Sequence, residues 1–286
     1  MDTVAILTDS NSGITGEEAL SLGVHVIPMP FIISDNSYFE GINLTQEHFY
    51  EILEGDDVIS TSMPAMGDTI DMFDKLLETY DSIVYIPMSS GLSGSTAAAQ
   101  LIANDYDGKV QVVDNHRISV TQRQSVLDAI TLRERGLSAA EIKDFLEEVK
   151  KESTIYIMVD TMYYLKRGGR VTPAAAELGT ILKIKPVLSI DGEKLDLFSI
   201  SRTVKSAKST MINQMKKDFK ERLKNEDGKN INLAIAYTKN RALAEEFAEE
   251  VRKEFPNNEL VIQPLSLSVS CHIGPGALAL ACSKKI

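Results

Sequence analysis

The sequence predicts an α/β protein of two domains built on mostly parallel sheets. Its length of 286 residues suits two domains. Short apolar runs rich in β-branched residues alternate with amphipathic segments along the whole chain. Most of the runs are continuously apolar, which is typical of strands covered by helices on both faces. We place the boundary near residue 150, between a domain of residues 1–150 and a domain of residues 151–286.

In the first half, predicted strands lead into predicted helices. Strands are expected at residues 4–10, 82–88 and 109–114, and a turn or hairpin at 35–43. Helices are expected at residues 16–23, 45–55, 63–80, 95–106, 117–135 and 138–152. Thr45 and Ser138 are predicted N-caps, and Glu141 completes a capping box with Ser138. The β-branched run 24–33 contains Pro28 and Pro30, which have no N–H to donate, so it is not expected to be a regular central strand of a sheet.

The second half repeats this alternation. Strands are expected at residues 154–160, 231–238 and 260–265, with two more within 185–201 around an Asp191-Gly192 turn. Helices are expected at residues 172–182, 203–224 and 241–255. Pro173 suits the first position of its helix, where the missing N–H costs nothing. Gly274-Pro275-Gly276 is expected to form a rigid turn into an apolar helix.

Charge and composition limit the classes of partner. The net charge of −11 argues against nucleic acid. Residues 1–150 hold 25 Asp and Glu against 8 Lys and Arg, whereas residues 151–286 hold 16 against 22. These charges form solvated faces, or the second half offers a cationic surface to an acidic partner.

Other sequence features indicate a cytoplasmic protein. No apolar run reaches the roughly 18–20 residues of a membrane-spanning helix, and the acidic start "MDTVAILTDS" is no signal peptide. Cys271 and Cys282 fit neither a disulfide framework nor zinc spacing, so we expect reduced thiols. We find no metal-binding motif and expect neither a metal nor a cofactor.

The stretch "SSGLSGS", residues 89–95, joins a predicted strand to a predicted helix. It fails the G-x-S-x-G pattern of a serine hydrolase, because Ser95 stands where the final Gly is needed. It also lacks the G-K-[ST] ending of a P-loop. A helix N-terminus rich in hydroxyls favours an anion of low charge such as a carboxylate. The alternative is a capped helix whose serines bond only to backbone.

Three further segments carry candidate site residues. Ser60, Thr61 and Ser62 form a second hydroxyl cluster before a helix, where capping is again the alternative. His272 is a binding candidate or a hydrogen-bonded structural residue. The segment "YLKRGGRVTP", residues 164–173, offers Arg170 to an anion or is an exposed basic turn.

Several of these stretches together resemble the DegV family of bacterial fatty-acid-binding proteins. They occur in the family's order and are "ILTDSNSGI" (6–14), "STSMP" (60–64), "SSGLSGS" (89–95), "VVDN" (112–115), "LKRGGRV" (165–171) and "HIGPGALAL" (272–280). The resemblance implies two α/β domains with a long-chain fatty acid in an apolar tunnel between them. It also implies that hydroxyls of Thr61 and Ser93 hold the carboxylate, with His272 in the same network and Ser62 beside it.

Some family members are similar to the acyl-carrying subunit of a fatty acid kinase, whose partner phosphorylates the bound fatty acid for phospholipid synthesis. That similarity implies a carrier with no turnover of its own. Ser90, Gly94 and Arg170 are expected to support the site. We predict that Arg170 and Arg202, with the lysines of residues 203–224, form a cationic face on which the kinase docks.

Two other classes of function remain to be compared with the carrier. One is an enzyme, a hydrolase or small-molecule kinase, that uses the Ser93 loop. The missing P-loop lysine and the failed hydrolase motif count against it. The other is a DNA-binding regulator, which the negative charge and the absence of a helix-turn-helix pattern disfavour.

Overall fold

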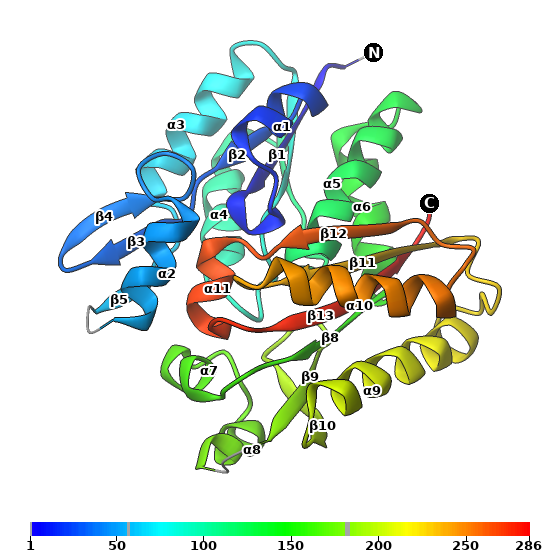
Figure 1. Cartoon of the computed structure of the whole chain (residues 1–286). Helices are drawn as coiled ribbons and strands as arrows, with labels where there is room; N and C mark the ends of the chain where they lie inside the picture. Colours follow the sequence, from blue (N-terminus) through cyan, green and yellow to red (C-terminus); the bar gives the residue numbers. More distant parts are fainter. Residues whose placement is uncertain (1, 56–57, 181–183) are drawn as a thin grey trace. The chain divides into compact units, whose positions relative to one another are not determined.

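The first strand, β1 (Val4–Asp9), is labelled in Figure 1, and it is buried along its whole length. The computed structural model describes residues 2–55, 58–180 and 184–286. These divide into unit 1, Met1–Lys150 with Ser266–Ser268, and unit 2, Lys151–Leu265 with Val269–Ile286. A short piece of the C-terminal part of the chain therefore belongs to unit 1, which a single cut near residue 150 does not anticipate.

Unit 1 contains a parallel sheet. Over its described residues, the strands β2 (His25–Ile27), β1, β6 (Ser82–Ile86) and β7 (Val110–Val112) lie in the order β2-β1-β6-β7. Every neighbouring pair is parallel. This confirms the predicted α/β class with a parallel sheet. The carboxyl ends of the strands consequently share one edge, where ligands bind in open α/β sheets.

Helices cover both faces of this sheet. The helices α3 (Met66–Leu77) and α4 (Ser95–Ala103) bury Phe73, Leu76, Ala99 and Ile102 against alternate residues of β1, β6 and β7. The helices α5 (Ser119–Glu134) and α6 (Ala139–Glu148) pack together and contact β1, β6 and β7. Ser138 and Glu141 form the predicted capping box of α6. Helix α1 (Gly16–Leu22) packs beside β2.

A second, antiparallel sheet interrupts this pattern in unit 1. It comprises β3 (Pro30–Ile33), β4 (Asn36–Phe39) and β5 (Ile59–Thr61), with β3 paired to both others among the described residues. The adjoining helix α2 (Gln46–Glu54) has the predicted Thr45 cap. Phe49 of α2 stacks edge-to-face on Phe31 of β3, with ring centroids 5.7 Å apart.

Unit 2 is built on a mixed sheet. Its described strands lie in the order β10-β9-β8-β13-β11-β12. They are β8 (Ser153–Met158), β9 (Lys185–Ile190), β10 (Asp196–Ser201), β11 (Ile231–Tyr237), β12 (Leu260–Pro264) and β13 (Leu278–Lys284). In this sheet, as described, β11 with β12 is the one parallel pair. The expectation of a mostly parallel second sheet is therefore wrong, because a continuously apolar run shows burial on both faces but not the direction of the neighbouring strand.

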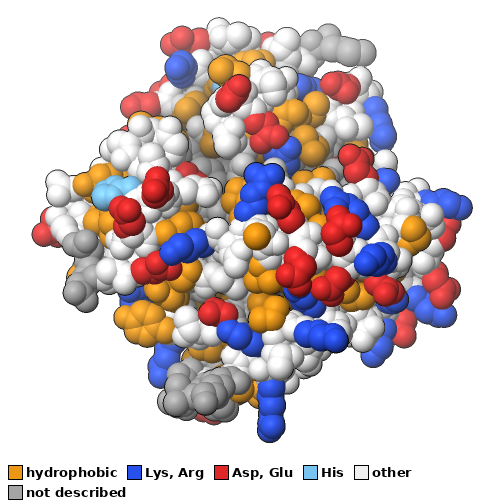
Figure 2. Space-filling model, viewed as in Figure 1, with side chains coloured by type: hydrophobic (Ala, Val, Ile, Leu, Met, Phe, Trp, Pro, Cys, Tyr) orange, Lys and Arg blue, Asp and Glu red, His pale blue; other side chains and the backbone are white. Residues whose placement is uncertain are grey.

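Helices α9 (Val204–Lys217) and α10 (Arg241–Glu254) cover one face of the mixed sheet (Figure 1). A π-helical turn, Asp218–Arg222, extends α9. Over these two helices Figure 2 shows Lys and Arg side chains intermingled with Asp and Glu. Lys208 pairs with Glu246 and Glu250, and Lys216 pairs with Glu254. Part of the expected cationic face is therefore neutralised by α10.

Two short helices of unit 2 and one strand differ from the predictions. Residues Tyr163–Gly168 form α7, which overlaps the segment 164–173 for which an anion site or an exposed basic turn was expected. Helix α8 (Pro173–Ala176) is followed by a 3-10 turn, Glu177–Thr180. Residues 181–182 of the predicted helix 172–182 lie outside the described residues. The apolar run after Gly276 is not a helix but the central strand β13, which pairs with β8 and β11. Burial between two strands outweighs the helix propensity of its Leu and Ala residues.

The helix α11 (Leu267–Ile273) begins in the part assigned to unit 1 and ends in unit 2. Gly274, at φ +84°, and Gly276, at φ +77°, then turn the chain into β13. Along the described stretches, no helix combines the length and the apolar character that crossing a membrane would require.

We expect Leu280→Ala to lower the free energy of unfolding by about 2–5 kcal/mol, because Leu280 is fully buried in the middle of β13. Urea denaturation followed by circular dichroism measures this change. Leu20→Ala is the matched control, since Leu20 is 85% exposed on α1, and it should change stability by less than about 0.5 kcal/mol. Equal losses in both variants would contradict the central position of β13.

Candidate functional site

The hydroxyl-rich loop, residues 89–95, connects β6 to α4. Ser89 is buried, and its Oγ accepts a hydrogen bond from Gly91 N at 3.2 Å. Its carbonyl accepts from the N–H groups of Leu92 and Ser93. Ser90 is exposed and donates its backbone N–H to Asp114 Oδ1 at 3.3 Å. Through these hydrogen bonds Ser89 and Ser90 stabilise the backbone conformation of the loop.

Ser93 and Ser95 keep donor capacity at the start of α4. Ser93 is partly buried, and its Oγ accepts from Ser95 N at 3.2 Å, which leaves the Ser93 hydroxyl proton free to donate. Ser95 is 5% exposed, and within the described chain its Oγ has no hydrogen-bond partner. Gly94 is the N-cap and provides no side-chain cap. Two hydroxyl groups therefore stand at the N-terminus of a nine-residue helix, where Ser93 Oγ bonds the N–H of Ser95 and the N-cap has no side chain to bond another.

The second hydroxyl cluster lies at the end of β5. Thr61 is the last residue of that strand and is partly buried, whereas Ser62 is exposed and donates its N–H to Pro30 O at 3.1 Å. Because β5 belongs to the antiparallel sheet, it does not pair with β6. The two segments nevertheless lie side by side, since a Cβ atom at Gly94 would be 4.0 Å from Met63 Sδ.

A buried carboxylate, Asp9, organises the end of β1. Its Oδ1 accepts from Asn11 N at 2.9 Å, Asn11 Nδ2 at 2.9 Å and Gln122 Nε2 at 3.0 Å. Its Oδ2 accepts from Met88 N at 2.8 Å, and the Met88 carbonyl accepts from Thr96 Oγ1 at 2.7 Å. Burial raises the pKa of Asp9, and these donors oppose that rise. Both the N–H and the carbonyl of Met88, which precedes the hydroxyl-rich loop, are therefore hydrogen-bonded to side chains.

The segment Ser266–Ser268 attaches to the same region of unit 1. Asn11 Oδ1 accepts from the hydroxyls of Ser266 and Ser268. Leu267 N donates to Glu40 Oε2 at 2.9 Å, and burial raises the pKa of Glu40 to about 7. The start of α11 is therefore fixed by side chains from the first 40 residues.

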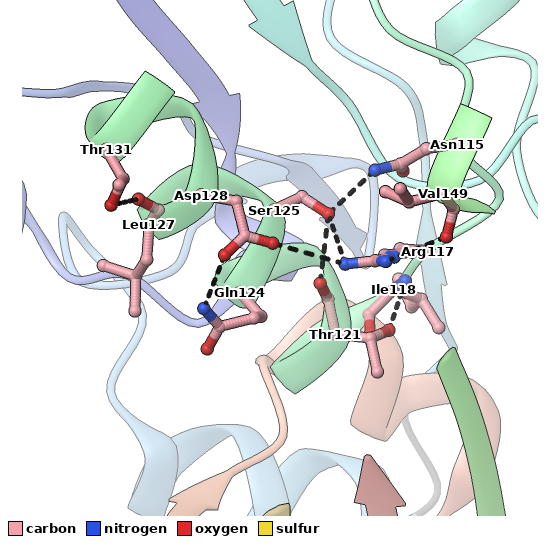
Figure 3. Close-up of polar contacts among 10 residues, drawn as sticks. All are labelled: Asn115, Arg117, Ile118, Thr121, Gln124, Ser125, Leu127, Asp128, Thr131 and Val149. Atoms are coloured by element: carbon pink, nitrogen blue, oxygen red, sulfur yellow. Dashed lines mark hydrogen bonds and ion pairs between the residues drawn. The ribbon is translucent and has the colours of Figure 1, made fainter. Parts of the chain in front are cut away.

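A second buried network supports the loop from the side of α5 (Figure 3). Arg117, only 1% exposed, donates to Ser125 Oγ at 3.2 Å and to Val149 O at 3.2 Å, and its guanidinium lies 3.8 Å from Asp128 Oδ2. Burial raises the pKa of Asp128, while the hydrogen bond from Gln124 and the charge of Arg117 lower it. Arg117 O in turn accepts from Ser89 N at 2.9 Å. The network consequently holds the backbone to which the hydroxyl-rich loop is bonded.

Sequence reasoning missed the supporting residues Arg117, Gln122, Ser125 and Asp128. The signal was present on α5, where Thr121, Ser125 and Asp128 recur at helical spacing and all are buried. Polar residues on the buried face of a helix need partners, so such a stripe indicates a hydrogen-bonded network.

In unit 2, the basic segment and the histidine segment come together. A Cβ atom at Gly168 would lie 2.3 Å from His272 Nδ1, so the α7 backbone packs directly against the imidazole. Arg170 is partly buried and donates to Gly168 O. Burial, followed by the charges of Arg170 and Arg167, lowers the pKa of His272 to about 4. His272 is therefore a neutral imidazole near pH 7 within a positive potential.

Three other residues of unit 2 from the sequence analysis are Arg167, Cys271 and Arg202. Arg167 and Cys271 lie close to His272 along the chain or in charge contact with it, and Arg202 lies on the surface. Arg167 stands 5.5 Å from the ring centre of Tyr163 and 5.4 Å from that of Tyr164. Cys271 is buried, and burial raises its pKa to about 11, which excludes a reactive thiolate at neutral pH. Arg202 is exposed in the turn between β10 and α9.

A family model described as "Uncharacterised protein, DegV family" matches residues 3–285. The chain belongs to the DegV family. Protein DegV of Bacillus subtilis is 31% identical over 283 residues, covering 97% of this chain and 98% of that protein.

Solved structures of DegV proteins share the fold over the whole chain. A DegV family protein from Thermus thermophilus, described for its fatty acid binding, has a TM-score of 0.89 and 27% identity and covers 99% of each chain. DegV of Bacillus subtilis, described as a fatty acid binding protein, has a TM-score of 0.87 and 29% identity and covers 100% of each chain. The DegV resemblance found in the sequence is thus confirmed.

The histidine generates a prediction about pH. Because the pKa of His272 lies near 4 in the folded chain and near 6.5 when unfolded, the unfolded state binds the proton more tightly. Stability should therefore fall as the pH drops from about 6.5 towards 4. His272→Gln should lack this component of the pH dependence in urea denaturation series.

His48→Gln provides the control for this experiment, because His48 is an exposed histidine on α2. Its stability profile should parallel that of the unaltered chain. A His272→Gln profile that also parallels the unaltered chain would show that His272 protonates equally in both states.

Proposed function

We propose that this chain binds a long-chain fatty acid and holds its carboxylate with the hydroxyls of Ser93 and Thr61. The observation that carries the proposal is the start of α4, where Ser93 and Ser95 keep unused hydroxyl protons at a helix N-terminus that Gly94 does not cap with a side chain. Ser62 adds an exposed hydroxyl to the same segment as Thr61. His272 of unit 2 is proposed as a further partner of the carboxylate, with Gly94 and Ser90 shaping the loop and Arg170 positioning His272.

The chemistry of these groups suits a carboxylate better than a phosphate. Neutral hydroxyl and N–H donors satisfy a single negative charge, whereas a phosphate ester usually recruits Lys or Arg directly. The neutral imidazole of His272 donates one hydrogen bond and adds no charge, while Arg167 and Arg170 supply positive potential around it. Such a setting stabilises the ionised form of a carboxylate at neutral pH.

The acyl chain supplies most of the binding energy in this proposal. Burial of each methylene contributes about 0.8 kcal/mol, so a chain of ~16 carbons yields on the order of 10 kcal/mol of transfer free energy. The carboxylate head group then needs only hydrogen-bond donors for its two oxygens, without a large contribution to the binding energy. The fatty-acid-binding descriptions of the DegV proteins from Thermus thermophilus and Bacillus subtilis, both above 25% identity, support this ligand class.

We further propose that the chain is a carrier without turnover of its own, acting in the cytoplasm and requiring no cofactor. A partner kinase would bring ATP, a carboxylate oxygen of the bound fatty acid would attack the γ-phosphorus, and ADP would leave to give an acyl phosphate. The serine-loop enzyme is less well supported. A hydrolase needs a base near Ser93, whereas the oxygen of the Ser93 hydroxyl accepts a hydrogen bond from the backbone N–H of Ser95.

Extraction of the purified chain followed by mass spectrometry should yield a fatty acid in near-stoichiometric amount. Ser93→Ala and Thr61→Val should each weaken fatty acid binding about ten- to a hundredfold, because each removes a hydrogen bond to a charged group. Affinity is measured by displacement of a fluorescent fatty acid.

Ser60→Ala is the matched control for these variants. Ser60 is exposed, and as the neighbour of Thr61 on β5 its side chain lies on the opposite face of the strand. It should bind fatty acid like the unaltered chain. Recovery of polar ligands alone, or esterase activity abolished by Ser93→Ala, would contradict the carrier proposal.

Arg202→Glu should slow acyl phosphate formation with a purified fatty acid kinase by about tenfold at low salt, because charge reversal on a docking surface acts mainly on encounter. Fatty acid affinity should stay unchanged. Arg170 is a less selective test of docking, since it also contacts the Gly168 backbone that packs on His272. Equal loss of fatty acid binding and phosphorylation in Arg202→Glu would exclude a docking role.

A further inference from the structure

A groove on unit 1 lies between α3 and α4, apart from the residues assigned to the fatty acid. Its volume is about 600 Å³. Its lining includes Met66, Ile70 and Asp74 of α3, Leu101 of α4, and Asp105 and Tyr106 of the following 3-10 turn. Three of these side chains are unusually open to solvent for their type, with Leu101 63%, Met66 45% and Ile70 37% exposed. Exposed apolar side chains gathered in one groove indicate an interaction surface.

Each wall of the groove changes from apolar to acidic along its length. Met66, Ile70 and Asp74 follow one another at intervals of four and form a stripe along α3. On the other wall, Leu101 of α4 is followed four positions later by Asp105 of the 3-10 turn. The Tyr106 hydroxyl donates to Asp74 Oδ1 at 2.8 Å, and this bond joins the C-terminal end of α3 to the 3-10 turn that follows α4. At the other end, Met63 lies beside Gly94, so the N-terminal ends are also adjacent. The groove therefore has an apolar end and an acidic end.

The acidic end carries a concentrated negative charge. Burial, the hydrogen bond to Asp74, and then the charges of Asp74, Asp105 and Asp71 raise the pKa of Tyr106 to about 12. Asp74 and Asp105 stand at the C-terminal ends of their helices, where the helix dipole is itself negative and disfavours carboxylates. Lys75 is adjacent on α3 but does not line the groove. The hydrogen bond from Tyr106 uses one oxygen of Asp74, and a bound cation would stabilise both carboxylates.

We propose that this groove docks a basic amphipathic segment of a partner protein. Two apolar side chains of the segment, one helical turn apart, would lie against Met66, Ile70 and Leu101, and a Lys or Arg would meet Asp74 and Asp105. This is the helix-in-groove mode of recognition, with anchors spaced at i and i+4. An anionic lipid surface fits less well, because the acidic end repels it.

A random 12-residue peptide library displayed on phage tests the proposal, with the purified full chain as bait and the Leu101→Glu variant for counter-selection. Enriched peptides should carry two apolar residues at helical spacing and a nearby Lys or Arg. Fluorescence anisotropy should show at least about tenfold weaker binding of these peptides to Leu101→Glu, which places a charge at the apolar end. Asp74→Asn with Asp105→Asn should weaken binding about three- to tenfold at low salt and reduce its salt dependence.

Asp144→Asn with Glu148→Gln is the matched control, since both carboxylates are exposed towards the C-terminal end of α6 in the same unit. It should leave peptide binding unchanged. Failure to enrich basic apolar peptides, or equal binding to Leu101→Glu, overturns the proposal. So does binding of phosphatidylglycerol vesicles that Leu101→Glu abolishes, or self-association that the Asp74→Asn, Asp105→Asn variant abolishes in analytical ultracentrifugation.

Discussion

The buried carboxylate of Asp9 is the constraint on which the loops of unit 1 depend. A charge without solvent costs several kcal/mol unless donors surround it. Asp9 meets this requirement with the Met88 backbone, both donors of Asn11 and the Gln122 side chain. Three segments far apart in the sequence must therefore converge on one point at the edge of the parallel sheet. The hydroxyl-rich loop begins at that point, so its position follows from the need to satisfy a charge.

Arg117 and Asp128 impose a similar requirement on the other side of the loop. Removing either partner would leave an uncompensated buried charge, which is far more costly than the loss of an exposed ion pair. The pair is linked to the loop through the bond from Ser89 N to Arg117 O. Hydrogen bonds of this kind fix the backbone of the hydroxyl-rich loop, and a loop fixed in advance loses less conformational entropy when any ligand binds to it.

Local signals in the sequence predicted much of the fold. Thr45, Ser138 and Pro173 identify helix starts because a cap or a missing N–H acts within a few residues. The strand at Leu278–Lys284 was mistaken for a helix because its Leu and Ala residues favour helices, and pairing with β8 and β11 decides the outcome. The residues of the candidate site likewise include some that the sequence indicated and some that it did not. Candidate donors such as Ser93 were visible as a motif. Gln122 instead bonds to Asp9, 113 positions away along the chain, and one partner of Arg117 is the carbonyl of Val149, 32 positions away.

The return of Ser266–Ser268 to unit 1 has a consequence for biosynthesis. Asn11 Oδ1 receives its two hydroxyl donors, and Glu40 its backbone donor, from residues near the end of the chain. During translation, a ribosome must therefore synthesise the chain as far as Ser268 before all of these bonds can form. A gene fragment that stops at residue 150 would consequently encode a unit 1 that lacks these three hydrogen-bond donors.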